Sequence, residues 1–236
     1  MIIIMDELTP IANLFRSDKG TGDFVDPDPL LSRSIPKYPH NFTSFYDEYL
    51  NEYRNVYRRV LEIGVFLGSS VLMWDKYFPN AEIFGMDIKD SYIGKKPIRS
   101  FFGDQSKKED LQKMIDTFGG NYDLIVDDGG HTMKQQQTTL GFMFKHLNPG
   151  GFFIVEDLHT SLFDINLDTH NNTLTLIENL SNGKKITSDY MQEDEIKYLM
   201  ENCDICSIHR TPHEKPHPGR EEDFSITCVI KKKREN

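Results

Sequence analysis

The sequence predicts an α/β fold with a doubly wound, mostly parallel sheet. Between residues 58 and 157, short apolar runs alternate with helix-length segments, which is the order typical of such sheets. The predicted strands end at acidic side chains: Glu62, Asp87, Asp104, Asp127-Asp128 and Glu156-Asp157. Because ligands bind at the carboxyl ends of parallel strands, and buried carboxylates need partners, this edge predicts a donor-rich ligand, a metal, or both.

The composition is ordinary for a soluble globular protein. The chain has 236 residues, 38% hydrophobic and 27% charged, which is enough for one sizeable domain. Its formal net charge of −10 disfavours nucleic acid as a partner. The apolar stretch 1–5 is too short for a signal peptide or a membrane span, and three cysteines do not suggest a disulfide framework. We therefore expect a cytoplasmic protein with no membrane partner.

Residues 1–57 are expected to precede the sheet as an arm and one helix. Glycines and prolines interrupt residues 6–40, which favours an arm over a domain. Over residues 42–54, apolar side chains recur at the spacing of one helical face. These residues are Phe42, Phe45, Tyr46, Tyr49, Leu50 and Tyr53. Asn41 and Thr43 offer capping oxygens at the start of this helix. The aromatic stripe suits either a core or a pocket wall, and the sequence does not separate the two.

Residues 58–236 are expected to hold the sheet and its helices, with no second domain. The expected strands are 60–64, 81–87, 97–102, 122–126, 152–155, 203–209 and 224–231. The expected helices are 69–78, 107–118, 173–180 and 192–202, and a further helix-length segment ends at Asn148-Pro149-Gly150-Gly151. The loosely patterned stretch 161–190 predicts an insertion that covers the site, and 211–223 predicts an exposed loop.

The first strand and turn carry a glycine pattern that suits a nucleoside without a pyrophosphate. Glu62-x-Gly64-x-x-x-Gly68 is not the closely spaced glycine motif of dinucleotide-binding folds, which disfavours an NAD-dependent dehydrogenase. Asp87, at the end of the second strand, suits hydrogen bonding to ribose hydroxyls. Asp104 could accept a hydrogen bond from an adenine amino group.

Taken together, these motifs resemble the class I S-adenosylmethionine-dependent methyltransferases. The resemblance covers residues 58–157 and also includes Tyr122-Asp123 and Asn148-Pro149-Gly150-Gly151. It implies a Rossmann-like seven-stranded sheet whose last strand is antiparallel. It also implies that S-adenosylmethionine is the cofactor. The implied cofactor contacts are Glu62, Gly64, Gly68, Ser69, Asp87, Asp104, Gln105 and Asp127.

Four further motifs resemble the metal-dependent macrolide and deoxysugar O-methyltransferases of antibiotic or polysaccharide biosynthesis. They are Asp18-Lys19-Gly20-Thr21, Tyr46-x-x-Tyr49-Leu50, Asp127-Asp128-Gly129-Gly130-His131 and Glu156-Asp157-Leu158-His159-Thr160. In this family the arm helps to close the cofactor site, which implies cofactor-site roles for Lys19 and Tyr46. The resemblance also implies a homo-oligomer. The chain departs from the family at Gly130, often serine, and at His40-Asn41-Phe42, often His-Gly-Tyr.

The acidic pairs and His131 predict how a sugar hydroxyl would be activated. A hydroxyl holds its proton tightly, and a divalent cation bound to it lowers its pKa. Ligands that are all oxygen favour Mg²⁺, and Asp128, Glu156 and Asp157 are the expected set. The choice between Asp127 and Asp128 as the ligand stays open, since either one could serve the cofactor side instead. The resemblance implies that His131 is the base, and its ordinary pKa suits that role. The prediction is a Mg²⁺-dependent O-methyltransferase acting on a sugar or a glycosylated natural product; the role of His159 stays open.

Other readings of the same residues remain. The acceptor could be a non-sugar vicinal diol or a catechol-like compound, because the same metal chemistry activates both. The chain could also be a non-catalytic S-adenosylmethionine-binding protein. A rival zinc site could use Cys203, Cys206, His209, His213 and His217. We disfavour it because residues 203–209 also predict a strand leading into a loop.

Overall fold

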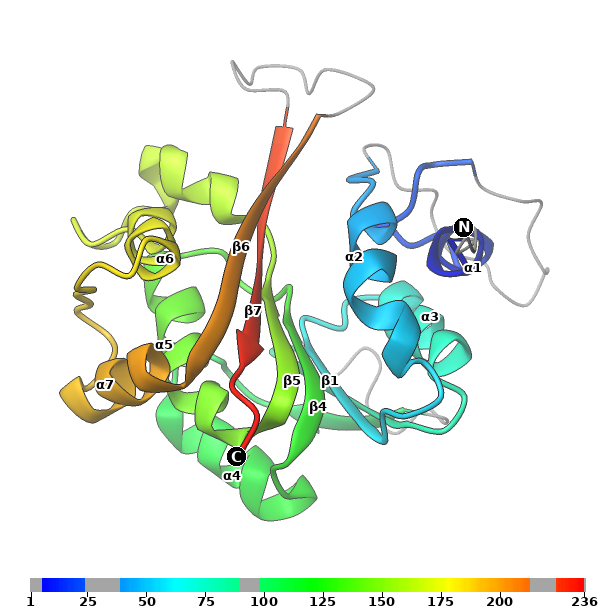
Figure 1. Cartoon of the computed structure of the whole chain (residues 1–236), viewed down its shortest axis with the longest axis horizontal. Helices are drawn as coiled ribbons and strands as arrows, with labels where there is room; N and C mark the ends of the chain where they lie inside the picture. Colours follow the sequence, from blue (N-terminus) through cyan, green and yellow to red (C-terminus); the bar gives the residue numbers. More distant parts are fainter. Residues whose placement is uncertain (1–5, 24–38, 90–97, 213–223, 236) are drawn as a thin grey trace.

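A computed structural model of the chain describes residues 6–23, 39–89, 98–212 and 224–235. Its centre is a seven-stranded sheet in the order β3-β2-β1-β4-β5-β7-β6 (Figure 1). The strands are β1 (Arg59–Ile63), β2 (Glu82–Asp87), β3 (Arg99–Phe102), β4 (Tyr122–Asp127), β5 (Leu147–Val155), β6 (Cys203–Pro212) and β7 (Phe224–Lys232). Strands β1 to β5 are parallel, whereas β7 is antiparallel to both β5 and β6. The predicted fold class, including the antiparallel end of the sheet, is confirmed.

Helices cover both faces of the sheet (Figure 1), so its inner strands are buried on both sides, whereas the edge strands β3 and β6 stay partly exposed. One face carries α1 (Leu8–Leu14), α2 (Thr43–Leu50), which continues into η1 (Asn51–Tyr53), and α3 (Ser69–Tyr77). The other carries α4 (Lys108–Phe118), α5 (Met133–Met143), η2 (Phe144–His146), α6 (Thr173–Ser181) and α7 (Glu193–Asn202). Successive side chains of a strand point to opposite faces, so Val60 and Leu61 enter different cores. This double burial explains why the strands are short apolar runs without strict alternation.

The helix ends that flank the site depend on local chemistry. Thr132 caps α5 through a capping box with Gln135, in which each side chain accepts a hydrogen bond from the other residue's backbone N–H. Gly119 ends α4 with a φ of +80°, as its place after the periodic segment predicts. The α2 helix differs from expectation, because its cap residue Phe42 makes no side-chain capping bond. The carbonyl oxygen of Lys19 instead accepts from Phe42 N at 2.8 Å and Thr43 N at 3.1 Å.

Three other features differ from the sequence expectations. The arm contains helix α1, which the many glycines and prolines of residues 6–40 did not predict. Strand β5 begins at Leu147, so residues 148–151 belong to the strand rather than to a loop before it. Helix α6 packs against β6 and α5, and no described residue of the 161–190 insertion lines the cavity described below. The interior of the arm, residues 24–38, and most of the expected loop 211–223 lie outside the described residues.

The aromatic stripe of α2 belongs to the core. Phe42, Tyr46 and Leu50 are fully buried, and Phe45 packs on Tyr46 with ring centroids 4.8 Å apart. Among the described helices, none is long and apolar enough to cross a membrane.

Candidate active site

The carboxyl ends of β1, β2, β4 and β5 open into a cavity of about 690 Å³, a size typical of small-molecule sites. Nine of the residues predicted from the sequence line it. They are Gly64, Gly68, Ser69, Asp87, Asp104, Gln105, Asp128, His131 and Asp157. The other five predicted residues are buried and do not line the cavity. They are Lys19, Tyr46, Glu62, Asp127 and Glu156.

The glycine turn after β1 brings the backbone close to the end of β4. Gly64 has a φ of +91°, and a Cβ placed there would overlap the Asp128 carbonyl and lie 2.7 Å from Gly129 Cα. The turn is held from the next strand, because Asp87 Oδ2 accepts from Val65 N at 2.9 Å and from Phe66 N at 2.7 Å. The turn therefore brings the Gly64 backbone and the Asp87 carboxylate to the cavity, together with the side chains of Phe66 and Leu67.

Gln105 links the loop after β3 to the end of β4. Its Nε2 donates to Asp127 Oδ1 at 2.8 Å and to Thr139 Oγ1 at 3.0 Å, and its Oε1 accepts from Gly130 N at 2.6 Å. Burial raises the pKa of Asp127 to about 7, and the hydrogen bond from Gln105 only partly offsets this. Asp127 is thus a buried structural partner of Gln105, and its neighbour Asp128 is the member of the pair that faces the cavity.

Asp104 sits at the cavity wall and also caps the loop before α4. Its Oδ1 accepts from Ser106 N at 2.9 Å and from Ser106 Oγ at 2.7 Å, and Lys107 lies 3.3 Å from Oδ2. Burial alone would raise the pKa of Asp104, but these contacts outweigh it and hold the pKa below its ordinary value. Asp104 is therefore an ionised acceptor at the edge of the cavity.

Lys19 lies in the middle of a buried carboxylate cluster behind the cavity wall. Its ammonium is 2.8 Å from Glu156 Oε2 and 3.4 Å from Glu62 Oε1, and it also pairs with Asp128. Tyr46 donates to the second oxygen of Glu156 at 2.7 Å. Burial alone would lower the pKa of Lys19, but its acidic neighbours, Asp128 first, raise it well above the ordinary value. Lys19 is therefore a fixed cation.

Asp128, His131 and Asp157 form the group most suited to a metal ion. One ligand atom of each lies within 4.8 Å of the others. Asp157 Oδ1 is buried and accepts no hydrogen bond from the described residues, which fits a cation at this point. Asp157 itself has a φ of +55°, an uncommon backbone conformation that aspartate tolerates better than most residues. Two carboxylates and an imidazole can therefore hold a divalent ion here.

Histidines surround Asp157. His131 Nε2 lies 3.4 Å from its Oδ2, and His159 Nδ1 lies 3.8 Å from its Oδ1. His40, which the sequence gave no role, lines the cavity and shares a 2.6 Å hydrogen bond with Ser225 Oγ. Burial alone would raise the pKa of Asp157, but the three histidines, His40 first, hold it below its ordinary value. The His40-Asn41-Phe42 motif was the signal that could have drawn attention to His40.

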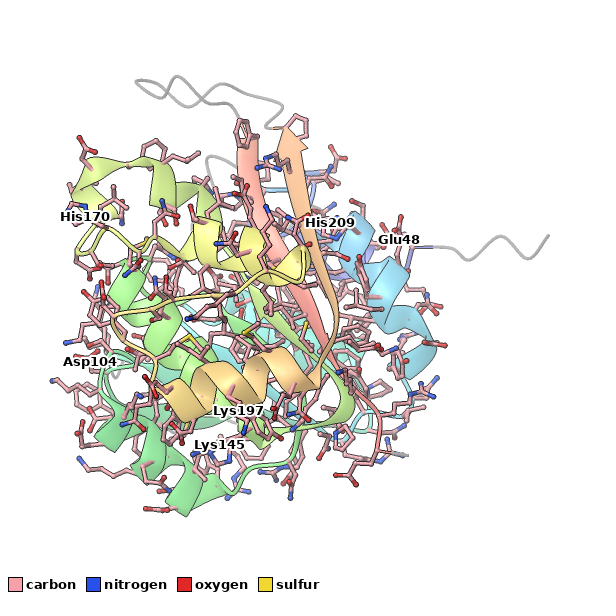
Figure 2. All side chains as sticks on the ribbon, turned by 60° about the vertical axis from the view of Figure 1, so that its left-hand side comes forward. Glu48, Asp104, Lys145, His170, Lys197 and His209 are labelled. Carbon is pink, nitrogen blue, oxygen red and sulfur yellow. The ribbon has the colours of Figure 1, made fainter. Side chains whose placement is uncertain are left out.

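In the structure, His209 of the rival zinc site contacts aromatic side chains of α2 rather than other potential zinc ligands. Figure 2 shows His209 on β6 next to Glu48 of α2; its ring stacks on Phe45 at 4.2 Å. The Tyr49 hydroxyl lies 3.0 Å from His209 Nε2. Within the described parts of the chain, no metal-binding group includes Cys203, Cys206 or His209. His213 and His217 lie outside the described residues.

Solved structures share this fold. The MycE methyltransferase of the mycinamycin pathway, in complex with Mg and SAH, superimposes on 97% of this chain and 55% of its own with a TM-score of 0.69 at 24% identity. A second crystal form covers 98% of this chain and 54% of its own, with a TM-score of 0.69 at 25% identity. The chain therefore has the fold of the class I S-adenosylmethionine-dependent methyltransferases.

Sequence similarity points to a particular group within that class. The mycinamicin VI 2''-O-methyltransferase of Micromonospora griseorubida is 38% identical over 130 residues, 52% of this chain and 32% of that protein. The demethylmacrocin O-methyltransferase of Streptomyces fradiae is 36% identical over 147 residues, 58% of this chain and 37% of that protein. The matched segments thus span about a third of the relatives' length. No family model matches the chain. The chain is similar in sequence to macrolide and sugar O-methyltransferases, as its motifs predicted.

Proposed function

We propose that the chain is a Mg²⁺-dependent O-methyltransferase that moves a methyl group from S-adenosylmethionine to a hydroxyl of a sugar or glycosylated natural product. The observation that carries this proposal is the meeting of Asp128, His131 and Asp157 in the same cavity as the glycine turn. The named activities of the relatives support the reaction and the acceptor class. Magnesium in the MycE complexes supports the metal.

For the cofactor, we assign the nucleoside to the side of the cavity formed by β1 and β2. Gly64 adds no side chain there, and Asp87 Oδ1, which accepts one hydrogen bond from Lys89 N, keeps a lone pair for a ribose hydroxyl. Ser69 at the start of α3, Asp104 and Gln105 complete this wall. Lys19, Tyr46, Glu62 and Asp127 would act from behind it, by holding the wall in place.

For the acceptor, we assign the side of the cavity formed by the ends of β4 and β5. A divalent ion held by Asp128 and Asp157 would lower the pKa of a bound hydroxyl. His131 lies beside both carboxylates and can take the hydroxyl proton. We keep His131 as the base rather than a metal ligand because Mg²⁺ favours oxygen ligands. Glu156, the third predicted ligand, already bonds to Tyr46 and Lys19 through its two oxygens.

The test is a screen of nucleotide sugars and glycosides with Mg²⁺ and S-adenosylmethionine, read by release of S-adenosylhomocysteine. We expect turnover with at least one sugar hydroxyl and its loss in EDTA, with recovery on excess Mg²⁺. Catechols in the same panel test the alternative acceptor class. Tight binding of S-adenosylmethionine with no turnover on any acceptor would favour a non-catalytic protein. We also propose that the acceptor is a small molecule, that the protein forms a homo-oligomer and that it is cytoplasmic.

A further inference from the structure

The methionine end of the proposed cofactor carries a carboxylate, which an acid-lined cavity does not favour. At neutral pH this end of S-adenosylmethionine has an α-carboxylate and an α-ammonium. Five carboxylate side chains line the cavity: Asp18, Asp87, Asp104, Asp128 and Asp157. They suit the ammonium and the sulfonium but repel the carboxylate. The α-carboxylate therefore needs a positive side chain or backbone N–H groups as partners.

The backbone N–H groups of the two turns beside the cavity already have acceptors. In the turn after β1 these donors are Gly64, Val65, Phe66 and Gly68. In the turn after β4 they are Asp128, Gly129 and Gly130. Binding a carboxylate through these groups would break hydrogen bonds that hold the two turns in shape. A side-chain cation is therefore the better partner for the carboxylate.

Arg16 is placed to supply that cation. Among the described residues that line the cavity, the lysine and arginine side chains are Arg16 and Lys89. Lys89 is exposed and follows Asp87 by two positions, so it lies on the nucleoside side. Arg16 belongs to the arm, is half-buried and lines the same cavity as Ser69. The helix before it, α1, packs against α3, which begins at Ser69 directly after the glycine turn.

The backbone of Arg16 is held in a conformation that arginine rarely adopts. Its φ is +54°. It ends α1 in a Schellman motif, in which Arg16 N donates to Asn13 O at 3.2 Å and Ser17 N donates to Ala12 O at 2.9 Å. Glycine is the usual residue at this position, because it has no Cβ and adopts a positive φ without strain. Backbone strain at a residue that lines a ligand cavity indicates a side chain kept for binding rather than for the turn.

We propose that Arg16 binds the α-carboxylate of S-adenosylmethionine and so fixes the methionine end of the cofactor. The inference rests on the proposed function, since it takes S-adenosylmethionine as the methyl donor. A planar guanidinium donates two parallel hydrogen bonds to a carboxylate, which sets both distance and direction. With the nucleoside held by β1 and β2, this second fixed end would aim the sulfonium methyl at the ends of β4 and β5. Arg16 is thus a cofactor-binding residue supplied by the arm.

The experiment compares S-adenosylmethionine with decarboxylated S-adenosylmethionine, which lacks only the carboxylate, by calorimetric titration. Arg16→Gln should weaken binding of S-adenosylmethionine by about tenfold or more and leave binding of the decarboxylated compound within about threefold. Lys89→Gln is the matched control, because it removes the same charge from the same cavity at an exposed position. Both affinities should stay within about threefold in this control. Arg16→Lys keeps the charge without the planar fork and should bind S-adenosylmethionine with intermediate affinity.

Arg16→Gly separates binding from folding. Glycine relieves the strained backbone, so the melting temperature should not fall, while S-adenosylmethionine binding should weaken as in Arg16→Gln. Equal weakening of both compounds in Arg16→Gln, or weakening of neither, would overturn the inference. So would a selective loss of S-adenosylmethionine binding in Lys89→Gln, because Lys89 would then hold the carboxylate. Absence of S-adenosylmethionine binding in the natural chain would instead refute the proposed cofactor.

Discussion

Replacing Gly64 by alanine should disrupt the cofactor side of the site far more than an equivalent substitution elsewhere. Gly64 has a φ of +91°, where an L-residue is strained by about 1–2 kcal/mol. The added Cβ would also overlap the Asp128 carbonyl and lie 2.7 Å from Gly129 Cα. Both are backbone atoms that cannot rotate away, so the turn and the end of β4 must separate. We expect the free energy of unfolding to fall by about 3 kcal/mol in total.

Gly183 provides the matched control. It has a φ of +65°, and a Cβ placed there would meet nothing within 4 Å. Gly183→Ala should therefore lower the free energy of unfolding by only about 1 kcal/mol, measured by urea denaturation. Calorimetric titration with S-adenosylhomocysteine should show binding weakened by about thirtyfold or more in Gly64→Ala and unchanged in Gly183→Ala. Equal stability losses in the two variants, or normal binding in Gly64→Ala, would refute the steric reasoning.

Three further predictions concern stability. Tyr46→Phe leaves one oxygen of buried Glu156 without its donor, so urea denaturation should show the free energy of unfolding lowered by about 1.5–3 kcal/mol. A decrease below about 0.5 kcal/mol would contradict this and mean that water replaces the hydroxyl. Thr132→Ala removes half of the capping box with Gln135 and should lower stability by about 1 kcal/mol, seen as a lower melting temperature; an unchanged melting temperature would contradict the cap. Burial, with nearby lysines, lowers the pKa of His146 from 6.5 to about 4, so the folded state favours the neutral ring. The contribution of His146 to the free energy of unfolding is present above pH 6.5 and is lost as the pH falls toward 4; allowing for its partial exposure, the loss is about 1–2 kcal/mol. His146→Gln should remove this part of the pH dependence of stability. Identical stability-versus-pH profiles for the variant and the natural chain would contradict the prediction.

The sequence could predict the sheet and which strand ends face the site, because both depend on local patterns. Each strand is a short apolar run that ends in an acid, and parallel order brings such ends together. The acidic residues at these ends that line the cavity were found this way: Asp87, Asp104, Asp128 and Asp157. Gly64, Gly68, Ser69 and Gln105 were instead implied by the resemblance to the class I methyltransferases. Helix α1 was not found although its apolar residues recur at helical spacing, because it has only 7 residues and contains Pro10.

The roles of single side chains were harder to predict because their partners are far apart in the chain. Lys19 and Asp128 are 109 positions apart, and no local pattern indicates that the lysine pairs with it. The same holds for Tyr46 and Glu156, which are 110 positions apart. Gly130 shows how a departure from a family motif can have a steric basis. A Cβ there would overlap the side chain of Gln135, which the capping box holds in place.

His131 is the proposed base for the acceptor hydroxyl, and His131→Ala removes it. His170→Ala is the control, since His170 is exposed (Figure 2) and is not among the residues that line the cavity. With an acceptor from the screen, we predict that S-adenosylhomocysteine release falls by about 10²–10⁴-fold in His131→Ala and is unchanged in His170→Ala. Binding of S-adenosylmethionine, measured by calorimetry, should be unaffected in both. Turnover by His131→Ala at the rate of the natural chain would contradict the assignment of the base.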